Sequence, residues 1–176
     1  VRIACYGYQR GFGGHFHNDN SVAVLRDIPG LVIASPAHPA DAGPMLRSCV
    51  AAAEIDGTVS AFLEPIARYH TTDLFDGDGL WQAPLHDGHV PIGRARTHGD
   101  GADITIATWA NGVWMSLRAL PRLRDEHGIS ARVLDLRWLA PLPIRQILAH
   151  ANEIDRVLVV DETRHSGGAG EGIVTG

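Results

Sequence analysis

The strongest constraint on the fold is that short apolar runs alternate with helical patterns along the chain. Residues 31–34 and 59–63 are largely apolar runs of strand length, which is typical of strands buried in a sheet. Between them, residues 39–53 repeat apolar side chains at spacings of three and four, as an amphipathic helix does. This strand–helix–strand order predicts parallel strands joined by a right-handed crossover.

A second unit of the same kind follows residue 101. Its strand-like and helical segments alternate over residues 103–108, 113–127, 131–136, 143–151 and 156–161. We expect Asn111 to cap the first helix and Gly128 to end it, because asparagine favours the N-cap and glycine the left-handed position after a helix. Three strands joined by two helices predict a small doubly wound α/β sheet.

The stretch between the two units has a different character. Residues 69–101 are rich in Gly, Asp and His, and they contain one strand-like segment, from Val90 to Ala95. We interpret the stretch as a linker that carries an edge strand. The expected organisation is therefore an α/β unit over residues 1–68, this linker, and a second α/β unit over residues 102–176.

Composition excludes several classes of function. The 176 residues include 15 Arg, no Lys and 20 acidic residues, for a formal charge of −5, which argues against a nucleic-acid or anionic-membrane surface. No apolar run approaches the roughly 18–20 residues that span a bilayer. Two cysteines, Cys5 and Cys49, make no disulfide framework and suit a reducing cytoplasm. Because the chain lacks an initiating Met and stops as a new segment begins at Gly172, we expect it to be part of a longer protein.

The first candidate site is the segment Gly13–Asn20, which contains two histidines and an aspartate. His17 titrates near neutral pH, which suits proton transfer. On an extended segment His15, His17 and Asp19 share one face and can converge on a metal such as zinc. Metallo-β-lactamase-fold hydrolases use such a His-x-His-x-Asp run, but Asn20 stands where they have a further His, and the βαβ order is wrong for them. A polar loop with histidines bonded to the backbone is the other interpretation.

The second candidate is the glycine-rich loop Gly167–Gly172, which follows a predicted strand. Such a loop can hold phosphate with its backbone N–H groups. Its Gly-Gly-x-Gly-x-Gly spacing is neither a Rossmann fingerprint nor a Walker loop, and the chain has no Lys to serve a Walker loop. We therefore favour a tight turn that packs a helix against the sheet edge.

The remaining polar candidates carry weaker signals. The linker contains four acidic residues, Asp73, Asp76, Asp78 and Asp87, which lack the regular ligand ladder of a calcium loop, so solvated turns are expected. Cys49 lies on the apolar face of a predicted helix and is expected in the core. No metal site is predicted from these residues.

Several short motifs stand in a characteristic order. They are His17-Asn18-Asp19-Asn20, Pro29-Gly30-Leu31-Val32-Ile33, Phe62-Leu63-Glu64-Pro65, Leu134-Asp135-Leu136-Arg137 and Val159-Val160-Asp161-Glu162, with Gly167-Gly168 after the last. In this order and spacing, the chain resembles the β-subunit of the decarboxylase component of 2-oxo acid dehydrogenase complexes. These are thiamine-diphosphate enzymes of the transketolase superfamily, and the resemblance covers essentially the whole chain.

The resemblance implies a fold and a division of the cofactor site. Residues 1–68 are similar to the second half of a pyrimidine-binding domain with a parallel sheet, and residues 102–176 to the transketolase-type C-terminal domain. The family's main ligands for thiamine diphosphate and Mg²⁺ then lie outside this chain, so its own cofactor-binding residues are unknown and the fragment alone is expected to be inactive. Some family members also bind K⁺ near the helix end after Cys49, where this chain has a longer loop, Ala51–Gly57.

The resemblance also implies a reaction and partners. The family decarboxylates a 2-oxo acid, here with the branched-chain type favoured, and reductively acylates a lipoyl group. His17 aligns with the histidine that orients and protonates the lipoyl ring, Asp19 would favour its imidazolium form, and His15 has no counterpart. The implied partners are an α-subunit or a fused α-like region, a second copy across a two-fold axis, and a lipoyl-bearing acyltransferase core.

Two alternatives remain at this point. A transketolase or related sugar-phosphate synthase would want a basic cleft, whereas Arg10, Arg68 and Arg94 are dispersed in the sequence. A non-catalytic docking module, in which residues 102–176 bind the acyltransferase core, is the alternative of another class.

Overall fold

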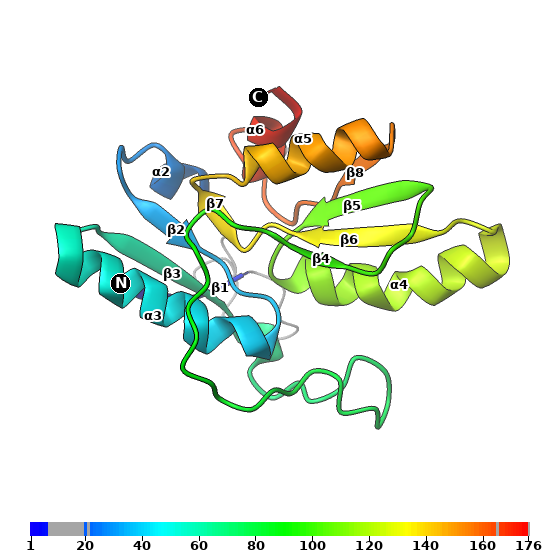
Figure 1. Cartoon of the computed structure of the whole chain (residues 1–176), viewed down its shortest axis with the longest axis horizontal. Helices are drawn as coiled ribbons and strands as arrows, with labels where there is room; N and C mark the ends of the chain where they lie inside the picture. The colour runs from blue at the N-terminus through cyan, green and yellow to red at the C-terminus, as the bar shows by residue number, and fades with distance from the viewer. Residues whose placement is uncertain (7–19, 21, 165, 176) are drawn as a thin grey trace.

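The computed structural model in Figure 1 describes residues 1–6, 20, 22–164 and 166–175. These residues form two four-stranded sheets. Sheet A contains, in spatial order, β1 (Arg2–Cys5), β3 (Ser60–Pro65), β2 (Val32–Ala34) and β7 (Trp138–Ala140). Sheet B contains β4 (Arg96–His98), β6 (Ala131–Asp135), β5 (Ile104–Thr108) and β8 (Val157–Val159).

Sheet A confirms the first predicted strand–helix–strand unit. Its strands β1, β3 and β2 are parallel, and α3 (Pro39–Asp56) connects β2 to β3. The Nδ1 atom of His38 accepts the Ala40 N–H over 3.2 Å at the start of α3, and Gly57 ends the helix with a φ of 78°. The short helix α2 (Val22–Arg26) precedes β2.

Sheet B confirms the predicted doubly wound unit. Its strands β6, β5 and β8 are parallel, with β5 in the middle. The connection through α4 (Asn111–His127) leads from β5 to β6, and α5 (Ile144–Glu153) precedes β8 on the other side of β5. Right-handed crossovers in opposite directions place these helices on opposite faces of the sheet, as Figure 1 shows. The last described helix is α6 (Ala169–Thr175).

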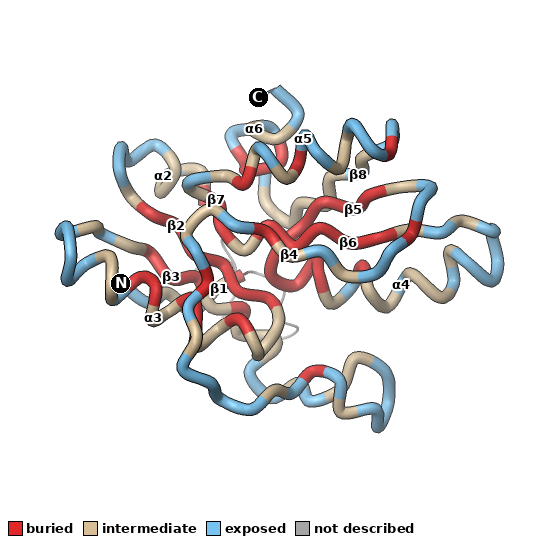
Figure 2. Tube along the Cα trace, viewed as in Figure 1, coloured by how far each residue is buried: buried red, intermediate tan, exposed pale blue. Residues whose placement is uncertain are grey.

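Strand β7 joins the two sheets and was not predicted. After β6 in sheet B the chain turns through Leu136 and Arg137 and pairs antiparallel with β2 of sheet A. One apolar cluster consequently contains Ile33 of sheet A together with Leu134 of sheet B, and the buried segments meet between the sheets in Figure 2. The division of the chain at residues 68 and 101 into separate domains stays a prediction.

The predicted edge strand lies in a different place. Residues 90–95 are not a strand, because Pro91 starts a turn in which the Arg94 N–H reaches the Pro91 carbonyl over 3.1 Å and Gly93 takes a φ of 78°. The edge strand is β4, three residues long, which pairs antiparallel with β6. The apolar signal at Val90 reflects burial in the core instead.

Two local predictions were also wrong. Ala110, with φ 48° and ψ −124°, is the N-cap of α4 without a side-chain bond, whereas Asn111 is the first helical residue and turns its amide toward tertiary partners. The expected loop over residues 51–57 is instead the last turns of α3, which the alanines at 51–53 favour. Among the described helices, none is long and apolar enough to cross a membrane.

Candidate functional site

The predicted proton donor His17 and its neighbours His15 and Asp19 lie outside the described residues. The next residue described along the chain is Asn20. Its side-chain Nδ2 donates to the backbone carbonyl of Glu162 over 2.8 Å, and its own carbonyl accepts the Val22 N–H over 2.7 Å at the start of α2. Asn20 is therefore attached to the chain just after β8.

This attachment point lies at the topological switch point of sheet B. The chain leaves β5 toward β6 on one side, and β8 lies on the other side, so the strand connections change direction between β5 and β8. In open parallel sheets, ligands bind outside the carboxyl ends of the strands at such a point. Asn111 follows β5 and Glu162 follows β8, and Asn111 Nδ2 lies 3.2 Å from each carboxylate oxygen of Glu162.

The electrostatics at this point are set by Glu162 and Arg68. Burial raises the pKa of the Glu162 carboxyl, and the nearby Asp161 raises it further, while the Asn111 amide and the Arg68 guanidinium lower it. Arg68 Nε donates to Asn111 Oδ1 over 3.4 Å, and its guanidinium lies 4.1 Å from the centre of the Trp114 ring. A carboxyl group, a buried amide and a stacked cation from three elements thus lie together here.

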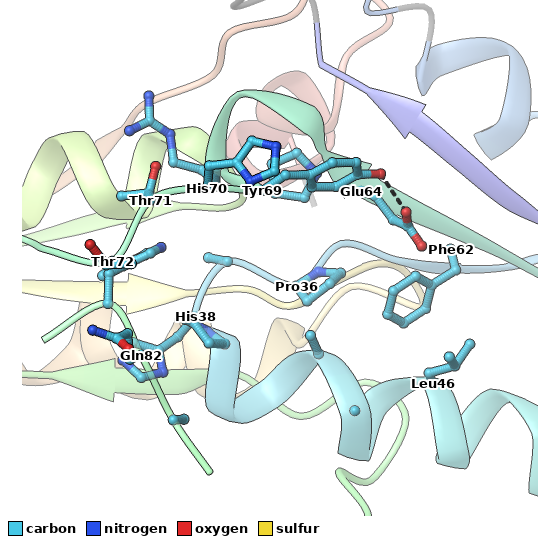
Figure 3. Close-up of a pocket in the computed structure, with 18 of the residues that line it drawn as sticks. Pro36, His38, Leu46, Phe62, Glu64, Tyr69, His70, Thr71, Thr72 and Gln82 are labelled. Atoms are coloured by element: carbon cyan, nitrogen blue, oxygen red, sulfur yellow. Dashed lines mark hydrogen bonds between the residues drawn. The ribbon is translucent and has the colours of Figure 1, made fainter. Parts of the chain in front are cut away.

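A pocket of about 820 Å³ lies beside the first turns of α3. Figure 3 shows His38 and Leu46 on one side and Glu64, Tyr69 and His70 on the other. The Tyr69 hydroxyl donates to Glu64 over 2.5 Å, and Arg2 forms an ion pair with the same carboxylate, which holds the pKa of Glu64 below its usual range. Burial and the bond to Glu64 raise the pKa of Tyr69 to about 12.

The chemistry of this pocket favours binding over proton transfer. Burial lowers the pKa of His38, whose Nε2 lies 3.3 Å from the Leu80 carbonyl and whose Nδ1 caps α3, so both of its ring nitrogens are engaged. Phe62 and Trp81 supply apolar walls. The sequence identified Glu64 only as part of a motif and gave no signal for His38, which comes from a distant segment.

A largely buried charge cluster lies between the two sheets, beside the pocket residue His38. Asp41, in the first turn of α3, binds Arg137 over 2.7 and 3.1 Å and Arg96 over 3.2 Å. Beside it, burial raises the pKa of the fully buried Asp135 to about 7. Burial and the Arg96 charge lower the pKa of His98 to about 4. This cluster ties α3 to β4 and to the β6–β7 connection.

The two thiols, one partly buried and one buried, are not nucleophile candidates. Burial raises the pKa of Cys5 to about 12 and also raises that of Cys49. Cys49 packs in a core cluster with Met45 and Phe62, which confirms its predicted place in the core.

The glycine-rich loop does not fit a diphosphate group. In the glycine-rich loop, the Gly170 N–H donates to Asp161 Oδ2 over 2.9 Å and the Gly167 N–H to the Glu171 carboxylate, so these donors are used internally. A Cβ at Gly168 would come within 2.6 Å of Thr163 Oγ1, which confirms a tightly packed turn.

The acidic residues of the linker do not form a site for a divalent metal. Asp78 accepts the backbone N–H groups of Leu74, Phe75 and Leu80, and Asp73 accepts that of Gly79, as expected of polar turns. No group of three His, Cys, Asp or Glu side chains in the described part of the chain could hold a metal ion.

Comparison with known families and sequences gives consistent matches. Residues 93–176 match the family described as "Transketolase, C-terminal domain". The chain is 34% identical over 155 residues to the 2-oxoisovalerate dehydrogenase subunit beta of Bacillus subtilis, covering 88% of this chain and 44% of that protein. It is 31% identical over 174 residues to the 3-methyl-2-oxobutanoate dehydrogenase subunit beta of Mycobacterium tuberculosis, covering 98% and 46%. The chain thus spans less than half the length of these curated relatives.

Two solved structures have the same fold. A split-gene transketolase, titled an inactive beta4 tetramer, matches with a TM-score of 0.68 at 23% identity, covering 98% of this chain and 51% of that one. A transketolase from Campylobacter jejuni matches with a TM-score of 0.64 at 15% identity, covering 94% and 24%. At these identities the likeness extends to the fold alone.

Proposed function

Because this chain belongs to the transketolase superfamily, as a homologue of the β-subunits of 2-oxo acid dehydrogenases, we propose that it is part of a thiamine-diphosphate-dependent 2-oxo acid decarboxylase component. We favour the branched-chain type. The observation that carries this choice is the 34% identity to a 2-oxoisovalerate dehydrogenase subunit beta, against 29% to the pyruvate dehydrogenase E1 component subunit beta from the same bacterium, Bacillus subtilis.

The proposed role of this chain is to supply the proton donor for lipoyl acylation and to hold it in position. When bound, thiamine diphosphate supplies the carbanion chemistry of decarboxylation. We assign the diphosphate and Mg²⁺ to an α-subunit, an α-like region or the remainder of the β-chain. The glycine-rich loop does not fit a diphosphate, and no described group of three His, Cys, Asp or Glu side chains could hold a metal ion. His17 is the proposed acid that protonates the lipoyl sulfur during reductive acylation. Asp19 would favour its imidazolium form, and His15 would lie nearby.

The proposed partners follow from the relatives. Their names contain "subunit beta", which implies a second kind of subunit, and this chain spans less than half of their length. These names support an α-subunit. On the family resemblance, we further propose a second copy across a two-fold axis and a lipoyl-bearing acyltransferase core. The two cysteines, both unpaired, support a cytoplasmic location.

The transketolase alternative receives less support. A phosphorylated sugar needs cations that face a cleft. Of the two arginines on the wall of the large pocket, Arg2 is paired with Glu64, and Arg68 donates to Asn111 and stacks on Trp114. The structural likeness to transketolases concerns the fold, which many chemistries share.

The test uses the intact parent protein with its α partner, thiamine diphosphate and Mg²⁺. Decarboxylation of pyruvate, 2-oxoisovalerate and 2-oxoglutarate would be followed with an artificial electron acceptor. We expect the highest kcat/KM with 2-oxoisovalerate. Binding of cofactor without turnover of any of the three would contradict the proposal and point to a sugar substrate, and no binding of cofactor would point to a docking module.

A variant of the same protein tests the role of His17. General acid catalysis by a positioned side chain contributes about 10²–10⁴-fold, so His17→Ala should slow acylation of a lipoyl domain by about 100-fold or more. Decarboxylation measured with the artificial acceptor should persist, because it needs no lipoyl protonation. Equal losses in the two assays would remove His17 from the proposed role.

A further inference from the structure

A second pocket, of about 710 Å³, lies where the turn before β4 meets the start of α5. Two segments that are far apart in the sequence line it, residues 92–94 of that turn and residues 141–146. It shares no lining residue with the pocket beside α3. Its volume lies within the range of about 300–1,000 Å³ that is usual for small-molecule sites.

Hydrogen bonds and close packing hold the two walls of this pocket together. The Gln146 side chain accepts the Ala95 N–H over 2.7 Å and donates to the Ala95 carbonyl over 3.3 Å, which fastens the turn to α5. A Cβ at Gly93 would lie 3.2 Å from Pro141 Cγ, so the turn also packs closely on the segment before α5. The two walls therefore present their side chains to the same space.

The pocket carries two arginines and no acidic group. Arg94 lies on the turn and Arg145 in the first turn of α5. In the part of the chain that the structure describes, neither side chain has an ion-pair or hydrogen-bond partner. Carboxylates do hold other arginines of the chain, such as Arg2, Arg96 and Arg132. Although the chain has a net charge of −5, this pocket thus contains two uncompensated cations, which favour an anion.

The donors on the wall suit a phosphate group better than a carboxylate. A guanidinium is a planar fork of N–H donors, and one fork suffices to bind both oxygens of a carboxylate. A phosphomonoester carries about 1.5 to 2 negative charges at neutral pH and three free oxygens, so two forks can bind it at once. The apolar side chains of Ile92, Leu142 and Ile144 complete the wall and suit the organic part of an ester.

We propose that this pocket is a binding site for an organic phosphomonoester. Arg94 and Arg145 bind the phosphate, and the apolar wall contacts the ester group. Arginine keeps its proton in proteins, and no other titratable side chain lines the pocket, so the site binds the ester without transforming it. The site is therefore additional to the decarboxylase reaction proposed above and does not depend on it.

Isothermal titration calorimetry of the intact parent protein tests the proposal. Thiamine diphosphate and Mg²⁺ are kept in excess, so that a cofactor site cannot take up the probe. The probe is phenyl phosphate, with inorganic phosphate as the comparison. Arg94→Gln and Arg145→Gln should each weaken binding of phenyl phosphate about tenfold or more, because each removes charge-assisted hydrogen bonds and one unit of charge. Inorganic phosphate should bind at least about threefold more weakly than phenyl phosphate, because it buries no apolar surface.

Arg156→Gln is the matched control, because it makes the same chemical change at an exposed arginine outside the pocket. It should leave the affinity unchanged. Since Arg94 and Arg145 are also exposed, their variants should keep the fold, which circular dichroism would check.

Three results would overturn the inference. They are an equal loss of affinity in Arg156→Gln, which would show a response to net charge alone, equal affinity for phenyl phosphate and inorganic phosphate, and no binding of either probe. A parent protein that binds phenyl phosphate through the two arginines but decarboxylates none of the three 2-oxo acids would support this site and contradict only the proposed function.

Discussion

The two halves of this molecule are joined by two polar networks of different construction. In the first, the Asp41 carboxylate binds Arg137 and Arg96, and the Asp41 and Arg137 side chains are only 6% and 12% exposed. In the second, the neutral Asn111 amide stands between the partly exposed Arg68 and Glu162. The first network is thus a buried ion pair, and the second is a hydrogen-bonded chain whose two end residues are partly exposed.

This difference separates stability from placement. A buried ion pair that loses one member leaves an uncompensated buried charge. Removing either partner is therefore strongly destabilising. A neutral amide between two partly hydrated charges costs less to lose, because water can solvate what remains. We therefore expect the first network to determine how firmly the sheets are joined, and the second to determine where the backbone after β8 lies relative to sheet A.

The largest effect is expected for Asp41→Ala. The change leaves Arg137 buried without its carboxylate partner, and breaking a buried pair in this way costs about 3–5 kcal/mol. Urea unfolding of the purified chain followed by circular dichroism would measure the free energy of unfolding. Asp87→Ala is the control, since the Asp87 side chain is fully exposed in its pair with Arg47, and it should change nothing measurable. If the two variants lowered the free energy of unfolding equally, the first network would not be what holds the two sheets together.

The next effect concerns pH. Burial raises the pKa of Asp135 to about 7, while an unfolded aspartate titrates near 3.8. The folded state therefore keeps a proton that the unfolded state has lost, and this contribution to stability falls as pH rises from about 4 to 7. Asp135→Asn should become more stable relative to wild type over that range, by at most about 4 kcal/mol, which is the free-energy equivalent of the shift. A difference that stays constant from pH 4 to pH 8 would show that Asp135 is already ionised in the folded state.

A smaller effect is expected at the second network. Asn111→Ala removes the amide that donates to Glu162, and leaving a partly buried carboxylate without this donor should cost about 1–2 kcal/mol. The cost should grow with pH as Glu162 ionises, and the pKa of Glu162 should rise, since the Asn111 bond lowers it. Thermal unfolding of this variant and of the exposed-site variant Asn152→Ala, between pH 5 and pH 8, would measure the effect. A cost as large as that of Asp41→Ala would remove the distinction between the two networks.

The parts of the fold that the sequence predicted are those specified by neighbouring residues. The apolar runs of β2, β3, β5 and β6, and the apolar spacing in α3 and α4, are local patterns, and their parallel order follows from crossover geometry. Strand β7 was missed because its three residues make a strand only by pairing with β2, which lies about a hundred residues earlier.

The candidate site was less predictable for the same reason. Asn111 was expected to be a cap because asparagine favours caps locally, but its actual partners come from residues 43 and 51 positions away. Asp41 and Arg137, in the first network, lie 96 positions apart. No local pattern signals such pairs, whereas the order of motifs along the whole chain did indicate the family.

The smallest effect tests a contact outside both networks. The Tyr69 hydroxyl donates to Glu64 on the wall of the large pocket, but Arg2 also binds that carboxylate. Tyr69→Phe therefore leaves Glu64 paired, and the free energy of unfolding should fall by less than about 1 kcal/mol. The pKa of Glu64 should rise, though less than in Arg2→Ala, because Arg2 is the main group that lowers it. Carboxyl chemical shifts measured by NMR during a pH titration would show both changes. If Tyr69→Phe destabilised the chain as much as Asp41→Ala, the contact between Tyr69 and Glu64 would be a third polar contact that stabilises the fold. The contrast between one structural and one positioning network would then fail.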